Sequence, residues 1–80
     1  MEKVVLSDKA KALKPGVYRH YSGKKYKVLG VAFHSETLEE LIIYRALYGK
    51  KYFWVRPIKM FQEKVMFGGK FIKRFKYLRK

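Results

Sequence analysis

The chain has 80 residues, and its twenty Lys and Arg against six Asp and Glu give a formal net charge of +14. It has no cysteine, which excludes disulfides, thiol nucleophiles and zinc–thiolate sites. No stretch has the length and hydropathy of a signal peptide or a membrane span, so we expect a cytoplasmic protein with no membrane partner.

The first fourteen residues are rich in Lys and Ala, and we expect a basic N-terminal tail that forms at most one helical turn. Ser7 or Asp8 could cap this turn, and Pro15-Gly16 would end it. Residues 15–80 are expected to form a single domain, because the chain is too short for a second core.

From Gly16 onward the pattern is typical of strands. GVYRHY and KYKVLGVAF flank the turn residues Ser22-Gly23, which predicts a hairpin. The second of these segments is apolar on both faces, as expected of a central strand. Gly30 in its middle predicts a bulge or a sharp bend.

The stretch HSETLEELIIYRALYG at residues 34–49 contains opposing signals. Thr37 with Glu40 resembles the capping box of a helix. The following LIIYRALY is dense in β-branched and aromatic residues, and alternate positions share one face. Because short links join it to strands on both sides, we predict a turn at 34–39 and a strand at about 40–48.

YFWVRP is predicted to be a strand that ends at Pro57, which cannot donate to a ladder, and IKMF to be a helical turn. EKVMF-GG-KFIKRFKYL predicts a hairpin whose second arm carries Phe71, Phe75 and Tyr77 on one face. Together these segments give about five antiparallel strands with short connections. We therefore predict a mainly β fold, a small SH3-like barrel.

No motif of a known reaction is present. The chain lacks a Walker loop, a G-x-G-x-x-G segment and a G-x-S-x-G elbow. Its single aspartate, Asp8, lies in the predicted tail, and its two histidines do not have the spacing of metal ligands. These absences favour a protein that is not an enzyme, and we expect neither a metal nor a cofactor.

The HSET segment is one candidate binding site. His34 could carry a proton while Glu36 holds its other ring nitrogen, and the hydroxyls of Ser35 and Thr37 could bind a polar ligand. The alternative is a structural turn in which these side chains bond to their own backbone.

Aromatic and cationic side chains alternate in three further segments. On strands, such residues can stack a base and hold a phosphate, or they can form the core with solvated cations beside it. The first segment is Tyr18, Arg19, His20 and Tyr21. The others are Trp54 with Arg56, and Arg74 beside Phe75.

These segments together resemble the domain of unknown function 1653 family, which consists of small bacterial proteins. The resemblance runs from about Lys14 to Leu78 and implies a compact, SH3-like β domain without an assigned activity. This chain has lysines where the family pattern carries acids, at Lys50, Lys51 and Lys64. The positions that match the motifs are Tyr18, Arg19, His20, Tyr21, His34, Ser35, Glu36, Thr37, Tyr44, Trp54, Arg56, Pro57, Met60, Phe61, Arg74 and Phe75.

The charge and the rings favour a small binding module that contacts nucleic acid, RNA in particular, through an aromatic and cationic patch. A net charge of +14 also fits a role in solubility or in growth at high temperature. The alternative function is a protein- or peptide-interaction module with an aromatic groove. A third is a small-molecule or enzymatic role at His34 and Glu36.

Overall fold

The computed structural model describes residues 4–80. Seven strands and two short helices follow one another along the chain. In order they are α1 (Asp8–Ala12), β1 (Gly16–His20), β2 (Lys25–Phe33), β3 (Glu40–Ala46), β4 (Phe53–Pro57), α2 (Ile58–Phe61), β5 (Lys64–Phe67), β6 (Lys70–Lys73) and β7 (Phe75–Arg79).

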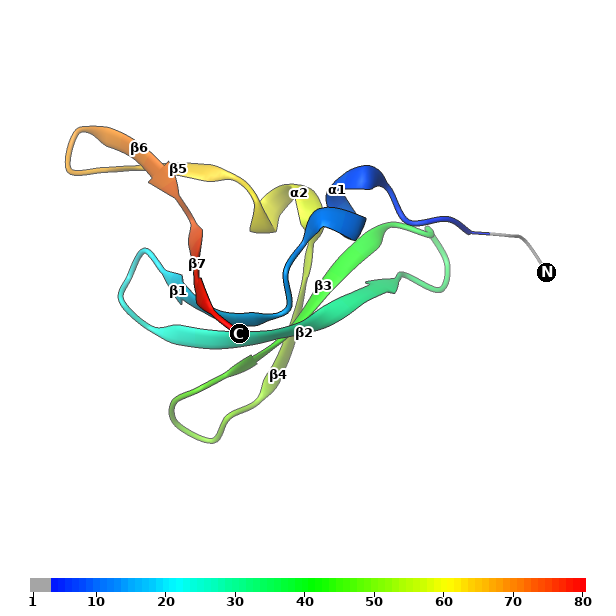
Figure 1. Cartoon of the computed structure of the whole chain (residues 1–80), viewed down its shortest axis with the longest axis horizontal. Coiled ribbons are helices and arrows are strands. Elements are labelled where there is room, and N and C mark those ends of the chain that lie inside the picture. Colours follow the sequence, from blue (N-terminus) through cyan, green and yellow to red (C-terminus); the bar gives the residue numbers. More distant parts are fainter. Residues whose placement is uncertain (1–3) are drawn as a thin grey trace.

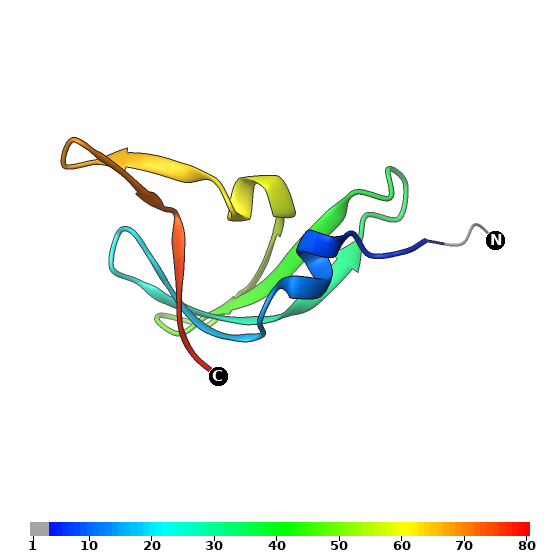
Figure 2. The same ribbon diagram turned by 45° about the horizontal axis from the view of Figure 1, so that its top comes forward.

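Five of the strands form one antiparallel sheet in the order β4-β3-β2-β1-β7, and β5 pairs with β6 in a separate hairpin. The mainly β fold is confirmed, but the number of strands is seven rather than five. The sheet curves without closing into a barrel, because β4 and β7 are its two edges and do not pair with each other. α1, α2 and the β5–β6 hairpin lie on the concave side, which we call the inner face (Figure 2).

β2 is central, as predicted, with β1 on one side and β3 on the other. Its register with β3 shifts between Val28 and Gly30, so the predicted bulge is present. A bulge increases the local twist and bends the strand. This bend lets one sheet wrap around the small core. β3 ends at Ala46, two residues before the predicted end, because the chain bends at Leu47 and turns at Gly49.

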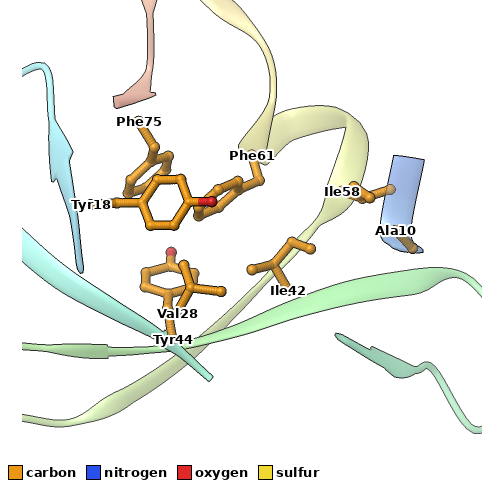
Figure 3. Packing of buried hydrophobic residues seen from close by; sticks show 8 residues of the cluster. All are labelled: Ala10, Tyr18, Val28, Ile42, Tyr44, Ile58, Phe61 and Phe75. Carbon is orange, nitrogen blue, oxygen red and sulfur yellow. The ribbon is translucent and has the colours of Figure 1, made fainter. Parts of the chain in front are cut away.

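The core lies on the inner face and consists largely of aromatic rings (Figure 3). Phe61 of α2 and Phe75 of β7 stack with a centroid distance of 4.2 Å and an interplanar angle of 6°. Tyr18 and Tyr44 pack around this pair, and their exposed fractions are 6% and 4%. Large rings bury much apolar area per residue, which is how so short a chain forms a core.

α1 packs against one end of this core, where Ala10 lies beside Ile58 (Figure 3). Ser7 is the N-cap, and its hydroxyl accepts a hydrogen bond from the backbone of Ala10. Both carboxylate oxygens of Glu40 on β3 accept from Ser7, one from the backbone N–H and one from the hydroxyl, each at 2.6 Å. These bonds lower the pKa of Glu40 and anchor the segment that was expected to be a tail.

The C-terminal arm is divided, contrary to the prediction of one continuous strand. At Arg74 the chain turns from β6 into β7, and the Arg74 N–H donates to the carbonyl of Glu63. Phe75 and Tyr77 therefore face the core of the main sheet, while Phe71 lies in the hairpin and is 69% exposed. The predicted shared face of these three rings is wrong for this reason.

Candidate nucleic-acid interface

The outer face of the sheet carries a row of cations that crosses three strands. Arg19 of β1 lies opposite Lys25 of β2 on one side and opposite Lys76 of β7 on the other. Because Tyr18 is buried and successive side chains alternate across a sheet, Arg19 projects from the outer face. All three cations are exposed.

Such a row is unfavourable for the folded chain by itself, since like charges directly opposite on neighbouring strands destabilise a sheet. No carboxylate among residues 4–80 forms an ion pair with Arg19, Lys25 or Lys76. The arrangement is therefore not explained by the packing of the sheet, and an anion bound across the row would relieve the repulsion.

A hollow of about 770 Å³ lies beside this row. Among residues 4–80, its lining contains the three cations of the row, a fourth cation from β6, two rings and no carboxylate. We call this hollow the basic groove. Its lining residues are Arg19, His20, Tyr21, Gly23, Lys25, Ile72, Lys73 and Lys76.

Tyr21 supplies an accessible ring in the basic groove, with 40% of its surface exposed. The ring packs on His20 at 4.5 Å and on Phe67 of the hairpin at 5.9 Å between centroids. Its backbone N–H donates to the carbonyl of Arg74 at 2.9 Å. Tyr21 is thus held in place beside the cations, as a platform on which a planar group can stack.

His20 is neutral in this arrangement. Its Nδ1 accepts a hydrogen bond from the backbone N–H of Ser22 at 3.2 Å, so the proton of the neutral ring is on Nε2. Burial lowers the pKa of His20, and the positive charges of Arg74 and Arg56 lower it further. The ring therefore supports Tyr21 and the turn and does not add a charge to the groove.

The cations extend beyond the groove along the outer face. In the next row of the sheet, Lys27 of β2 lies opposite Arg45 of β3, and Arg79 of β7 lies opposite Val17. The Arg45 side chain is fixed in place, since its Nε donates to the carbonyl of Lys51 at 3.0 Å. Two parallel rows of positive charge thus cross the sheet, and a polyanion can follow them.

Four of the five acids among residues 4–80 lie elsewhere, and the fifth, Glu63, pairs with Arg74 at the base of the β5–β6 hairpin. Glu36 and Glu39 are in the turn between β2 and β3, Glu40 begins β3, and Asp8 is in α1. These segments lie at one end of the molecule, while the β1–β2 turn and the β5–β6 hairpin lie at the other (Figure 1). The nine residues of β2 separate the two ends by roughly 25 Å at about 3.3 Å per residue. Four of the five acids thus lie away from the basic groove, although α1 carries Lys9 and Lys11 beside Asp8.

The HSET segment forms the turn predicted at 34–39. The Nδ1 of His34 accepts hydrogen bonds from the backbone N–H groups of Glu36 at 3.1 Å and Thr37 at 3.3 Å. The hydroxyl of Thr37 accepts from the N–H of Glu39. Leu38 follows with φ 62°, in the left-handed region. The His34 and Thr37 side chains thus satisfy the backbone of a tight turn, and Ser35 is exposed beside them.

The other predicted residues are divided between the core and the surface. Tyr18 and Tyr44 are buried, and the Arg56 Nε donates to the Tyr44 hydroxyl at 3.3 Å while its guanidinium lies over Phe75. Arg74 pairs with Glu63 at 3.0 Å. Trp54 is 52% exposed on the edge strand β4. Of the predicted set, the structure brings Arg19, His20 and Tyr21 together in the basic groove.

The residues predicted to form a binding site did not include Lys25, Lys73 and Lys76. The sequence feature that could have indicated them is the alternation of cations with apolar residues. Lys25 and Lys27 flank Tyr26, and Lys76 lies between Phe75 and Tyr77. That alternation places cations on the outer face of a strand, but only the register shows that they lie opposite Arg19.

Residues 4–80 contain neither a metal-binding cluster nor a membrane-spanning helix. No cluster of three or more His, Asp or Glu side chains could hold a metal ion in this part of the chain. No helix in the same range is long and apolar enough to cross a membrane.

The comparisons with known proteins agree with the fold. The family described as "Protein of unknown function (DUF1653)" matches residues 16–77. The chain belongs to this family. The crystal structure of a DUF1653 protein from Bordetella bronchiseptica is similar, with a TM-score of 0.80 and 35% identity over 86% of this chain and 91% of that one. No curated protein matches.

The DUF1653 match includes the whole basic groove, from Arg19 through Lys76. α1 and Arg79 lie outside the matched range. The family description assigns no activity, so any function has to be argued from the chemistry of the groove and of the outer face.

Proposed function

We propose that this DUF1653 protein is a binding module for single-stranded nucleic acid, RNA in particular, and that it binds in the basic groove. The observation that supports this most directly is the row Lys25–Arg19–Lys76, three exposed cations opposite one another with no carboxylate between them. Phosphates of a nucleic acid backbone would lie along the row and replace the repulsion with charge-assisted hydrogen bonds.

Tyr21 supports a single strand as the ligand. Its ring is next to the cations of the groove and is partly exposed, so an unpaired base can stack on it while the adjacent phosphates contact Lys73 and Lys76. Bases in a duplex are already stacked on one another and cannot use such a ring. We therefore expect single strands to bind more tightly than duplexes of the same length.

The test is a titration of labelled single-stranded RNA of about twelve nucleotides, within the usual footprint of one small domain. The triple variant Arg19→Gln/Lys25→Gln/Lys76→Gln should reduce the slope of log K against log salt by about 2, because each phosphate contact on a single strand contributes about 0.7. Tyr21→Ala should weaken binding about tenfold, since stacking contributes about 1–3 kcal/mol per base.

A matched control separates the groove from the net charge. Lys11→Gln/Lys50→Gln/Lys59→Gln removes three exposed cations outside the groove. This variant should keep most of the affinity and of the salt slope. Equal losses in the two triple variants, together with no effect of Tyr21→Ala in a protein that is still folded, would leave only a general attraction to polyanions.

A further inference from the structure

The edge strand β4 has an unusual surface. Four consecutive apolar side chains are exposed there, with exposed fractions of 61% for Tyr52, 63% for Phe53, 52% for Trp54 and 59% for Val55. Edge strands of soluble proteins usually carry a lysine, a proline or a bulge that prevents pairing with another chain. In β4 the proline is Pro57 at the last position, which leaves residues 53–56 open to another strand.

The backbone of β4 also offers hydrogen bonds. The N–H of Ala46 donates to the carbonyl of Tyr52 at 3.0 Å, so the Tyr52 carbonyl points toward β3. Because the bonding direction alternates along an antiparallel strand, Trp54 and Arg56 also face β3, while Phe53 and Val55 direct their N–H and C=O groups outward. β4 is an edge of the five-stranded sheet, so these groups have no partner strand among residues 4–80 (Figure 1).

We propose that β4 is the contact through which two copies of this chain associate, with residues 52–56 of each copy paired antiparallel about a two-fold axis at Trp54. In this register Phe53 of each copy lies opposite Val55 of the other. These are the residues whose backbone groups point outward, so each such pair exchanges two hydrogen bonds. The contact is isologous and closes after two copies, which avoids open-ended growth.

The side chains are complementary in the same register. Tyr52 of one copy lies opposite Arg56 of the other, and the aliphatic part of Arg56 can pack on this ring while its guanidinium stays over Phe75 of its own copy. Arg56 is the one charge in residues 52–56, so no like charges lie directly opposite each other in the paired segment.

The area is sufficient for a weak dimer. A large ring offers about 150–250 Å², so the exposed parts of the four side chains supply roughly 400 Å² per copy. The backbone of the two strands brings the total to about 1,000 Å², which is near the lower limit for a specific interface. We therefore expect a reversible dimer that forms at high protein concentration.

Salt distinguishes this contact from the proposed binding of RNA. Each copy has a formal charge of +14, so two copies repel at low salt. At about 1 M NaCl the Debye length is about 3 Å, and the repulsion is screened. Dimerisation should therefore become stronger with salt, while binding of a polyanion becomes weaker.

Sedimentation velocity over a concentration series at low salt and at about 1 M NaCl tests the proposal. We expect a dimer whose Kd falls with salt. Val55→Lys should raise this Kd about tenfold or more, because it places a charge in an apolar contact twice per dimer. The control Phe71→Lys, at an exposed ring outside β4, should leave the Kd unchanged. A monomer under every condition, or equal effects of the two variants, would overturn the proposal.

A disulfide test reports the register. The chain has no cysteine, so introduced ones act alone. Trp54→Cys places two thiols directly opposite across the axis, within the range of a disulfide. Tyr52→Cys places them roughly 13 Å apart, four residues out of register. We expect a mild oxidant to link the first variant into a dimer and not the second. Equal linkage of both variants, or of neither, would contradict this register.

Discussion

The two faces of the sheet use the same residue types in opposite ways. On the inner face the rings pack against one another, and a cation among them, Arg56, is fixed by the Tyr44 hydroxyl and the Phe75 ring. On the outer face Arg19 has cations as its cross-strand neighbours on both sides. The inner face is thus explained by stability, whereas the row of cations on the outer face costs stability, which is why we propose a ligand for it.

The largest expected effect is on the inner face. Phe75→Ala removes the ring that stacks on Phe61 and should cost about 3–5 kcal/mol, through lost burial and the cavity left behind. A chain of this length has a total stability of roughly 4–12 kcal/mol, so urea should unfold the variant at a much lower concentration. Phe71→Ala, at a ring that is 69% exposed, should change the stability by less than about 0.5 kcal/mol. Similar losses in both would refute the assignment of the core.

The docking of α1 should give the next largest effect. Ser7→Ala removes the N-cap and the hydroxyl that donates to Glu40, and should lower the free energy of unfolding by about 1 kcal/mol. The folded-state pKa of Glu40 is lowered from its ordinary value of 4.5. The stabilisation that comes from the bonds between Ser7 and the Glu40 carboxylate is therefore present above about pH 4.5 and is lost as the pH falls further. Denaturant curves at pH 7 and pH 3.5 should show a smaller difference between the variant and the natural chain at pH 3.5. Ser35→Ala, in an exposed turn, is the control.

His20 should produce a weaker dependence on pH near neutrality. Its pKa is lower in the folded chain than its ordinary value of 6.5, so the unfolded chain takes up a proton more readily as the pH falls below 6.5. The melting temperature should therefore decline between pH 7.5 and pH 5.5, until the folded chain is also protonated. His20→Gln should flatten this decline. A decline of the same size in the variant would rule out His20 as its source.

The smallest effect has the opposite sign and lies on the outer face. Arg19→Thr removes the central charge of the row and should raise the free energy of unfolding by a few tenths of a kcal/mol, up to about 1 kcal/mol, because two like-charge contacts are lost. The gain should shrink at high salt, where the repulsion is already screened. A loss of stability would show that Arg19 has a structural role and would weaken the contrast between the faces.

Much of the fold could be predicted from local sequence signals. Gly30 marked the bulge, Ser22-Gly23 the first hairpin and Pro57 the end of β4, because each of these residues restricts or frees the backbone at its own position. The turn at 34–39 was also predicted. These features depend on neighbours in the sequence, which a single chain displays directly.

What depended on distant contacts could not be predicted. The division of the last arm at Arg74 is set by a bond to the carbonyl of Glu63, eleven residues earlier, while the pattern of Phe71, Phe75 and Tyr77 looks continuous. Similarly, the cations of the groove come from four strands, and their meeting depends on the register rather than on any one segment.

Glu63 and Arg74 hold together the two ends of the β5–β6 hairpin. The two residues are joined by a backbone hydrogen bond of 3.1 Å and by an ion pair of 3.0 Å, and the hairpin between them is a separate small sheet. Residues 64–73 thus leave and re-enter the domain at a single point. Insertions at the Gly68-Gly69 turn should therefore cost little in chain entropy and leave the main sheet in place.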